Sequence, residues 1–343
     1  MIVTGNPDIV SIFAGGGVDA VPDAPEVSPG RLIGGGTVVV CTYMRRASMA
    51  LFLDSLAAQT RTPHRLVVVD ASPEDDTERM LRSRPGNERL AGGLLYCRVK
   101  GNLKGLTRQR NFGVRFVATD LIVFFDDDVI LRPSCLAEME KPFREGGGEI
   151  VGVGGFTEGI YQPPDRLWRT RCKLGIVANL RPGSYQRSGM SVPWMFLPPT
   201  QGIVAADFLP GCGMMWKTTV LREVGFGEMF DGYAQGEDLD FSLRARRHGR
   251  LVIAGAAVFQ HLFDVGGRPD QGKLGYMAIY NRFHIQRRGL DDRTWRDVAW
   301  FAYAWGLDTL MLLRNLPVPS RTRGIFLQIG GRIRATFDLL RGR

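Results

Sequence analysis

The amino-acid sequence predicts an α/β protein in which helices flank a mostly parallel sheet and a helical C-terminal extension follows. Between residues 37 and 125, apolar runs of strand length alternate with amphipathic segments of helix length. Beyond about residue 270, only helical patterns remain. With 343 residues, 44% of them hydrophobic, the chain is long enough to bury one large core and to carry an appendage.

The first half of the chain has the pattern of a βαβ series. The predicted strands are 37–41, 65–70, 94–99 and 121–125, and the predicted helices between them are 47–59, 75–83 and 107–118. Continuous apolar runs such as VVVC and LIVFF are typical of parallel strands that helices bury on both faces. Ligands of such sheets bind beyond the carboxyl ends of the strands. Polar residues stand at three of these ends: Thr42 and Tyr43, Asp70, and the triplet 126–128.

The remaining segments suggest a division into three parts. Residues 1–30 are rich in glycine and proline, which predicts a flexible leader or an addition to the sheet edge. The main domain is predicted over 31–262 and the helical extension over 263–343. Within the main domain, the stretch 161–200 is predicted to form long loops that act as a flexible lid. Later elements are predicted as a helix at 237–248, a strand at 251–259, and helices at 270–288, 293–314 and 322–341.

The formal net charge of +9, carried largely by arginine, favours phosphate or carboxylate partners. Charge alone does not distinguish nucleic acid, an anionic membrane and a nucleotide diphosphate. The five cysteines are far apart and form no CxxC pair, and no secretory signal is visible at the N-terminus. We therefore expect a reduced, cytoplasmic location.

Three consecutive aspartates, Asp126, Asp127 and Asp128, follow the predicted strand 121–125. In an extended segment alternate side chains share a face, so Asp126 and Asp128 point together while Asp127 points away. Divalent cations such as Mg²⁺ and Mn²⁺ take oxygen ligands, usually one or two carboxylates together with substrate phosphates. The triplet predicts a divalent metal site, although a solvated acidic turn would have the same sequence.

A second acidic group, GEDLD, opens the predicted helix 237–248. Acidic residues in a first helical turn are favoured by the helix dipole, so this group also has a purely structural interpretation.

Taken together, these segments resemble a family 2 glycosyltransferase with the GT-A fold over about residues 37–261. The segments that carry the resemblance are VVVCTYMRR, VVVDASPEDD, LKGLTRQRNFGVRFVATDLIVFFDDD, GEDLD and VFQHLFD. The resemblance implies inverting transfer of a sugar from a nucleotide-diphosphate donor to a hydroxyl of a glycan or lipid-linked glycan acceptor, with Mn²⁺ or Mg²⁺ as cofactor.

The resemblance also implies roles for individual residues. Asp126, Asp128 and His261 would hold the metal, Asp238 would be the general base, and Glu237 would support or replace it. The donor would contact Thr42, Tyr43, Arg45, Asp70, Arg110, Asn111, Asp126 and Asp127. Among these, Asp70 would bond the nucleobase, while Arg110 and Asn111 would lie near the diphosphate. The chain departs from the family at Gln109, where a small residue is common.

The C-terminal residues 325–343 have the pattern of a basic amphipathic helix, in which apolar residues recur at spacings of three and four between arginines. Such helices lie on anionic membranes or pack against their own protein. Peripheral contact with the inner face of a membrane is therefore one expectation. The apolar run 298–313 is too short to span a bilayer.

Two other functions are disfavoured by the sequence. Nucleotidyl transfer would require a glycine-rich, lysine-bearing phosphate loop, and residues 42–48 have none. A nucleic-acid partner is not expected, because the two acidic groups would repel phosphates unless a metal were bound. An inactive GT-A-like protein, or a basic protein that binds a phosphate ligand, remains as the alternative.

Overall fold

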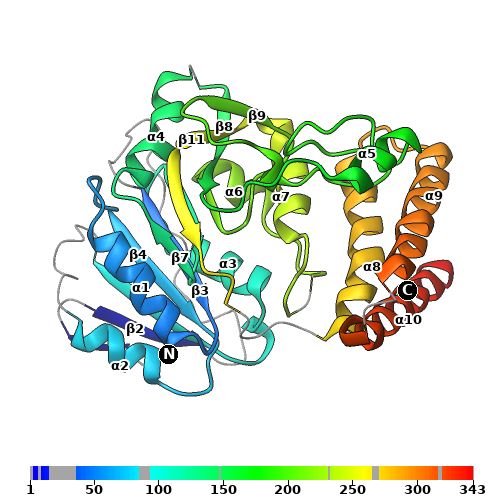
Figure 1. The fold of residues 1–343 in the computed structure, drawn as a ribbon. Coiled ribbons are helices and arrows are strands. Elements are labelled where there is room, and N and C mark those ends of the chain that lie inside the picture. The colour runs from blue at the N-terminus through cyan, green and yellow to red at the C-terminus, as the bar shows by residue number, and fades with distance from the viewer. Residues whose placement is uncertain are drawn as a thin grey trace. The chain divides into compact units, whose positions relative to one another are not determined.

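The computed structural model describes residues 3–6, 9–14, 36–84, 93–146, 148–230, 232–264, 270–315 and 319–342. The chain divides into two compact units (Figure 1). The first comprises Met1–Tyr161 and Pro199–Gly267, and the second comprises Gln162–Pro198 and Arg268–Arg343. Residues 162–198 therefore belong with the C-terminal helices rather than with the sheet.

The first unit begins with the predicted βαβ series. Its elements are β3 (Thr37–Thr42), α1 (Arg46–Ala57), β4 (Arg65–Asp70), α2 (Asp76–Ser83), β5 (Leu94–Val99), α3 (Leu106–Val114) and β6 (Leu121–Asp126). Val38 and Val40 pack in one core cluster with Phe52 of α1. On the opposite face, a Cβ atom at Gly113 of α3 would lie 2.7 Å from Val39 Cγ1. Both faces of the strand are thus buried, as its continuous apolar run predicted.

One sheet runs through the first unit in the order β1-β2-β5-β4-β3-β6-β10-β8-β11-β7, with β9 beside β11. The strands from β2 (Ile9–Ala14) to β6 are all parallel. Strand β1 (Val3–Asn6) pairs antiparallel with β2 at the edge of the sheet. The described strands thus confirm the predicted parallel sheet up to β6.

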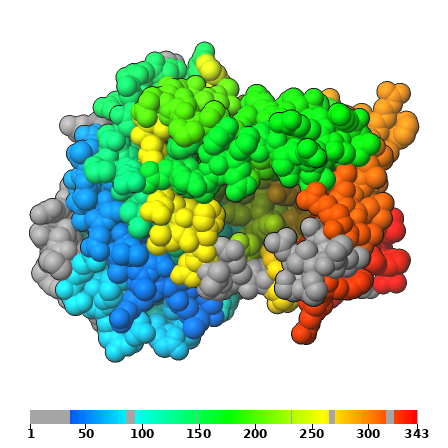
Figure 2. Space-filling view, viewed as in Figure 1, coloured from blue at the N-terminus to red at the C-terminus, as the bar shows by residue number. Residues whose placement is uncertain are grey.

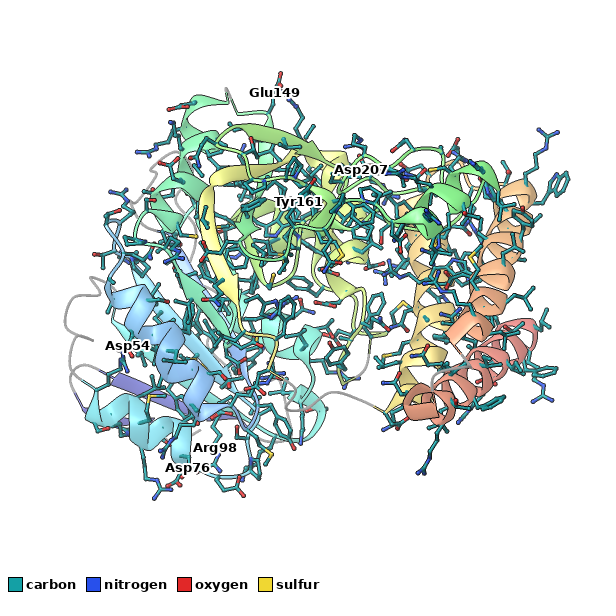
Figure 3. All side chains as sticks on the ribbon, in the orientation of Figure 1. Asp54, Asp76, Arg98, Glu149, Tyr161 and Asp207 are labelled. Carbon is teal, nitrogen blue, oxygen red and sulfur yellow. The ribbon has the colours of Figure 1, made fainter. Side chains whose placement is uncertain are left out.

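Beyond β6 the sheet is mixed: β8 and β11 pair in parallel and the other described pairs are antiparallel, so the prediction of a mostly parallel sheet holds fully only up to β6. The further elements are β7 (Val129–Leu131), α4 (Cys135–Glu145), β8 (Ile150–Thr157), β9 (Ile203–Ala206), β10 (Gly213–Lys217), α6 (Thr218–Val224), α7 (Glu237–Ala245) and β11 (Arg250–His261). Strand β10 is antiparallel to both β6 and β8, and β11 is antiparallel to β7 and β9. Charged side chains on this unit, such as Asp54, Asp76 and Glu149, point outwards (Figure 3).

The second unit is helical and has its own core. Its helices are α5 (Arg166–Lys173), α8 (Gln271–Gly289), α9 (Trp295–Leu312) and α10 (Pro319–Leu340), and short 3₁₀ turns occur at Trp194–Phe196 and Leu313–Asn315. Ile176 and Met190 pack in one cluster with Ile279 and Phe301. The prediction of loops over 161–200 is therefore wrong for α5. The role of this stretch as an acceptor-side lid stays a prediction.

Helices α8 and α10 cross at very short range, which only glycine allows. A Cβ atom at Gly331 would lie 2.0 Å from Gly272 O, and one at Gly275 would lie 2.1 Å from Gln328 O. Both are far below any normal van der Waals contact, so these positions fix which side of α10 faces α8. In the part of the chain that the structure describes, the helices are too short or too polar to cross a membrane.

Candidate active site

The candidate site lies where β3, β4 and β6 end, beside the end of β11. Asp126 is the last residue of β6 and follows five buried apolar residues, so its carboxylate emerges at the sheet edge. Its backbone N–H donates to Cys212 O at 3.3 Å, which ties the triplet to the segment before β10. Strand β7 then returns antiparallel to β11 and sets Val129 opposite His261. This pairing brings His261 to the triplet although 133 residues separate it from Asp128.

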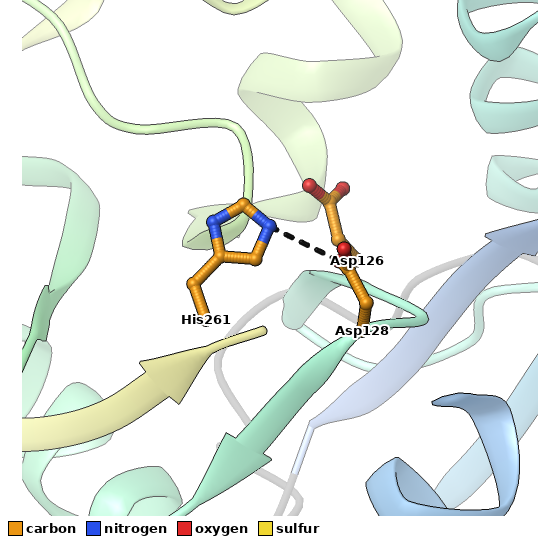
Figure 4. A group of neighbouring side chains, drawn as sticks. All are labelled: Asp126, Asp128 and His261. Atoms are coloured by element: carbon orange, nitrogen blue, oxygen red, sulfur yellow. Dashed lines mark hydrogen bonds and ion pairs between the residues drawn. The ribbon is translucent and has the colours of Figure 1, made fainter. Parts of the chain in front are cut away.

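Asp126, Asp128 and His261 offer ligand atoms that all lie within 4.8 Å of one another (Figure 4). Asp128 Oδ1 and His261 Nε2 are 3.1 Å apart, and Asp128 Oδ2 accepts a hydrogen bond from Asp264 N at 2.9 Å. Asp127 instead reaches Thr42, in agreement with the alternation expected from the sequence. The structure thus brings together the three predicted metal ligands.

The electrostatics of this cluster favour positive charge. Burial would raise the pKa of Asp128, but the hydrogen bond and charge of His261 and the N–H of Asp264 outweigh it and lower that pKa. Burial would lower the pKa of His261, but its bond to Asp128 and the charge of Asp126 raise it instead. For Asp126, burial is the main cause of a raised pKa. In this site His261 stabilises the ionised form of Asp128, whereas burial makes the ionised form of Asp126 less stable.

Arg45 and Thr42 hold the middle aspartate. Thr42 Oγ1 donates to Asp127 Oδ2 at 2.6 Å, and Arg45 Nη1 donates to Asp127 Oδ1 at 3.1 Å. Arg45 also lies 3.6 Å from Asp128 Oδ2. Burial raises the pKa of Asp127 to about 7, although Thr42 and Arg45 act in the opposite direction. Thr42 and Asp127, both predicted to contact the donor, thus bond each other in this structure.

Asp70, predicted to bond the nucleobase, and Tyr43, predicted to contact the donor, differ in exposure. Asp70 is fully buried, and its two oxygens accept hydrogen bonds from Ser72 N at 2.7 Å and Tyr96 Oη at 2.9 Å. Tyr43 is exposed, with Lys104 Nζ 4.3 Å from the centre of its ring. Asp70 therefore shapes the end of β4 through protein contacts, while Tyr43 presents an open ring face. Direct contacts of either residue with a nucleobase stay predictions.

Arg110 links the two acidic motifs. It is only 2% exposed, and its Nη1 donates to Glu237 Oε1 at 2.8 Å. Its Nη2 donates to Asp126 Oδ1 at 3.4 Å and to Gly211 O at 3.1 Å. Its guanidinium also lies 5.2 Å from the centre of the Phe226 ring. A single buried cation thus contacts both the aspartate triplet and the GEDLD segment.

Asn111, the neighbour of Arg110, bonds a different part of the chain. Its Nδ2 donates to Phe226 O at 3.0 Å, and its Oδ1 accepts from Phe226 N at 2.9 Å. Asn111 thereby anchors the segment that follows α6. Its predicted place beside the donor diphosphate gains no support from these contacts.

Helix α7 begins with the second acidic motif after Gly236, which has a left-handed φ of 89°. Glu237 is buried and bound to Arg110; burial, followed by the charge of Asp238, raises its pKa against the effect of Arg110. Asp238 is half-buried, and its Oδ2 accepts a hydrogen bond from Gly211 N at 3.0 Å. Of the two residues, Asp238 is the more accessible carboxylate.

Backbone strain is concentrated near the site. Among the described residues, positive φ outside glycine occurs at Met44 (57°), Ala234 (55°) and Phe263 (56°). Met44 lies between Tyr43 and Arg45, Ala234 lies just before α7, and Phe263 lies two residues after His261. Non-glycine residues in this region are uncommon and cluster at functional sites.

Contacts between distant segments add two residues that the sequence did not single out, Ser48 and Asp264, and they show what Gln109 bonds. Asp264 Oδ2 accepts from Ser48 Oγ at 2.7 Å, and Asp264 O accepts from Arg45 Nη2 at 3.2 Å. In the space-filling view, the yellow end of β11 accordingly lies on the surface against the blue residues near the start of α1 (Figure 2). Gln109 Nε2 donates to Thr42 O at 3.3 Å and to Val69 O at 2.9 Å, which joins the ends of β3 and β4.

Known proteins share both the sequence pattern and the fold of this domain. Residues 37–192 match the family model described as glycosyl transferase family 2. Over these residues, which make up less than half of the chain, the sequence is similar to glycosyltransferases of family 2. The match includes Asp126 to Asp128 and ends before Glu237, Asp238 and His261. No curated protein sequence matches the chain.

Solved structures of this type are similar in fold. The crystal structure of GalNAc-T7 with UDP, GalNAc and Mn²⁺ aligns with a TM-score of 0.58 at 14% identity over 89% of this chain. The chain spans 57% of the length of that structure. The structure of S. aureus TarS 1–349 aligns with a TM-score of 0.50 at 14% identity, over 90% of this chain and 92% of that one. These similarities confirm the predicted GT-A fold.

Proposed function

We propose that this protein is an inverting glycosyltransferase that moves a sugar from a nucleotide-diphosphate donor to a hydroxyl of a glycan or lipid-linked glycan acceptor. The observation that carries the proposal is the convergence of Asp126, Asp128 and His261, together with Arg110, which links this cluster to the acids that open α7. The match of residues 37–192 to the family model supports the reaction class. The bound UDP of TarS and the bound UDP and Mn²⁺ of GalNAc-T7 support a nucleotide-sugar donor and a cation.

The cofactor in this proposal is Mn²⁺ or Mg²⁺. Two carboxylates and an imidazole form an oxygen- and nitrogen-donor set that suits a manganese-like ion, and their ligand atoms are already gathered within 4.8 Å. A bound cation would offset the negative charge that develops on the departing diphosphate. Asp264 N and Arg45 would hold Asp128 in place for this purpose.

Asp238 is the proposed general base. A sugar hydroxyl attacks efficiently only if its proton is removed as the new bond forms, so a carboxylate must be accessible to it. The Asp238 carboxylate is half-buried and is oriented by Gly211 N, whereas that of Glu237 is buried against Arg110. Glu237 would therefore position Arg110 and the start of α7. Attack on the face opposite the diphosphate inverts the anomeric carbon without a covalent nucleophile.

The donor would lie across the ends of β3 and β4. The exposed Tyr43 ring offers a stacking face for a nucleobase, with Lys104 beside it as a phosphate or base partner. Arg110 would act through the positive charge that it places between the two acidic motifs. Among the predicted donor ligands, Tyr43 is exposed, and the side chain of Asp126 (31%) is more accessible than that of Arg45 (19%).

A donor screen tests this proposal. UDP-, GDP- and dTDP-sugars are incubated with the full chain in Mn²⁺ or Mg²⁺, and the released nucleoside diphosphate is measured with and without EDTA. We expect one nucleotide class to be hydrolysed slowly, and EDTA to abolish its hydrolysis. Release that continues in EDTA would contradict the metal-dependent mechanism. A donor that raises the melting temperature but is never cleaved would favour a protein that only binds nucleotide sugars.

A further inference from the structure

Helix α10 presents three distinct sides. One side packs within the second unit, where Ile325, Arg332 and Ala335 are buried and Gly331 lies against the α8 backbone. Arg332 Nη1 donates to Asp308 Oδ2 of α9 at 3.1 Å, which adds an ion pair to this packed side. The rotation of α10 about its own axis is thereby fixed, and so are the residues that it leaves exposed.

A second side of α10 is an exposed apolar row. Its members are Phe326, Ile333, Phe337 and Leu340, which are 59%, 51%, 57% and 80% exposed. They follow one another at spacings of seven, four and three residues, and at about 100° per residue they occupy a stripe only about 60° wide. Four large apolar side chains in one exposed row are more than scattered surface hydrophobics would give.

The third side is basic and adjoins the apolar row. Arg323, Arg334 and Arg341 are exposed and follow one another at spacings of eleven and seven residues. These spacings place them about 40–120° around the helix from the apolar row, away from the packed side. The sequence 319–343 has a single acidic residue, Asp338, which accepts a hydrogen bond from Tyr276 of α8 at 3.1 Å. Asp338 also lies 3.9 Å from Arg334 Nε, so one carboxylate adjoins the basic row, whereas the apolar row contains none.

We propose that this apolar and basic surface of α10 lies in the interface of an anionic lipid bilayer. An apolar row with phenylalanine and leucine beside an arginine row is the composition of helices that lie in the plane of a membrane. The phenyl and aliphatic groups would enter the acyl boundary while the guanidinium groups bind lipid phosphates. This inference rests on the proposed function, because a lipid-linked acceptor would lie at the same membrane surface.

Vesicle sedimentation with the full chain tests the inference. The vesicles are phosphatidylcholine alone or phosphatidylcholine with about one third phosphatidylglycerol, which supplies the anionic surface. We expect co-sedimentation with the anionic vesicles only, and binding that weakens as salt screens the arginines. The double variant Phe326→Gln with Phe337→Gln should lower the partition coefficient at least about 10-fold. Arg334→Gln with Arg341→Gln should lower it about 25-fold.

Matched controls separate membrane binding by α10 from a general loss of folding or of activity. Leu51→Gln removes an exposed apolar side chain of α1 in the first unit and should leave vesicle binding unchanged. Glutamine favours helix, so the α10 variants should keep the wild-type melting temperature. Hydrolysis of a soluble donor, measured without vesicles, should also be unchanged. Lost vesicle binding with intact hydrolysis supports the inference and leaves the proposed function untouched.

Two results would overturn the membrane assignment. In one, wild-type protein binds anionic vesicles no better than phosphatidylcholine, or the α10 variants bind as well as wild type. In the other, sedimentation velocity finds a dimer that the two phenylalanine substitutions dissociate, which would assign the apolar row to a second copy of the chain.

Discussion

Replacing Asp238 with asparagine is expected to lower kcat about 10²–10⁴-fold, the usual contribution of a general base. Asparagine keeps the shape and one acceptor oxygen, which can replace the bond from Gly211 N or the one from Leu239 N, so the start of α7 should change little. It cannot take up the acceptor proton at neutral pH. Because the nucleotide is expected beyond the ends of β3 and β4, its affinity should stay at the wild-type value.

Steady-state kinetics and calorimetric titration of the nucleoside diphosphate measure the two quantities separately. The matched control is Glu237→Gln, which alters the adjacent carboxylate while keeping an oxygen that accepts from Arg110. We expect its kcat to fall less than about 10-fold, since a positioning residue that retains its bond loses little. If Glu237→Gln were the more damaging change, the base would have been assigned to the wrong residue.

Replacing Arg110 with methionine is expected to lower the free energy of unfolding by about 3–5 kcal/mol, the typical cost of removing one partner of a buried ion pair. Methionine fills much of the same volume between Phe124 and Phe226. It leaves Glu237 without its cation and Asp126 without its bonded donor. Urea unfolding followed by far-UV circular dichroism measures the change.

Two further variants test the cause of that loss. Arg108→Gln, on the same helix but partly exposed, should change the free energy of unfolding by no more than about 0.5 kcal/mol. In the Arg110→Met background, Glu237→Gln should recover part of the stability, because a neutral amide replaces the unpaired carboxylate. If the changes in the free energy of unfolding caused by the two substitutions were fully additive, Arg110 and Glu237 would not interact.

The parallel half of the sheet was predictable because its strands are continuous apolar runs. In the other half only β11 was predicted, as a strand at 251–259, and β8 illustrates why the rest was not. Its sequence IVGVGGFT has three glycines, which normally weaken a strand. In the fold they are required: a Cβ atom at Gly152 would lie 2.5 Å from the Trp216 ring, and one at Gly154 would lie 2.4 Å from Ile253. Such a requirement comes from packing between distant strands, so local sequence patterns do not reveal it.

The structure of residues 162–198 also depends on packing between distant segments rather than on local sequence patterns. Ile176, Val177 and Met190 are buried against the C-terminal helices, but their spacing follows neither a helical nor a strand period. A proline- and arginine-rich stretch of this kind therefore looks like a surface loop until its tertiary contacts are known.

In the candidate active site, the two short acidic motifs were predictable from the sequence, but the contacts that link them were not. The alternation of an extended chain correctly separated Asp127 from its neighbours. The position of Arg110 between the two motifs depends on its contact with Glu237, 127 residues away along the chain. The position of Asp264 depends on its contact with Ser48, 216 residues away. Both are set by how β6, α7 and β11 meet, which local sequence patterns do not determine.

Electron paramagnetic resonance of Mn²⁺ titrated into the protein, with UDP, GDP or dTDP present in turn, tests whether Asp126, Asp128 and His261 bind a metal. We expect one bound Mn²⁺ per chain, with an affinity that rises in the presence of the correct nucleotide. Asp128→Asn should abolish this binding, because the variant keeps the volume of the side chain but removes a carboxylate ligand. Equal Mn²⁺ binding by wild type and Asp128→Asn, or none by wild type with any of the three nucleotides, would contradict the account.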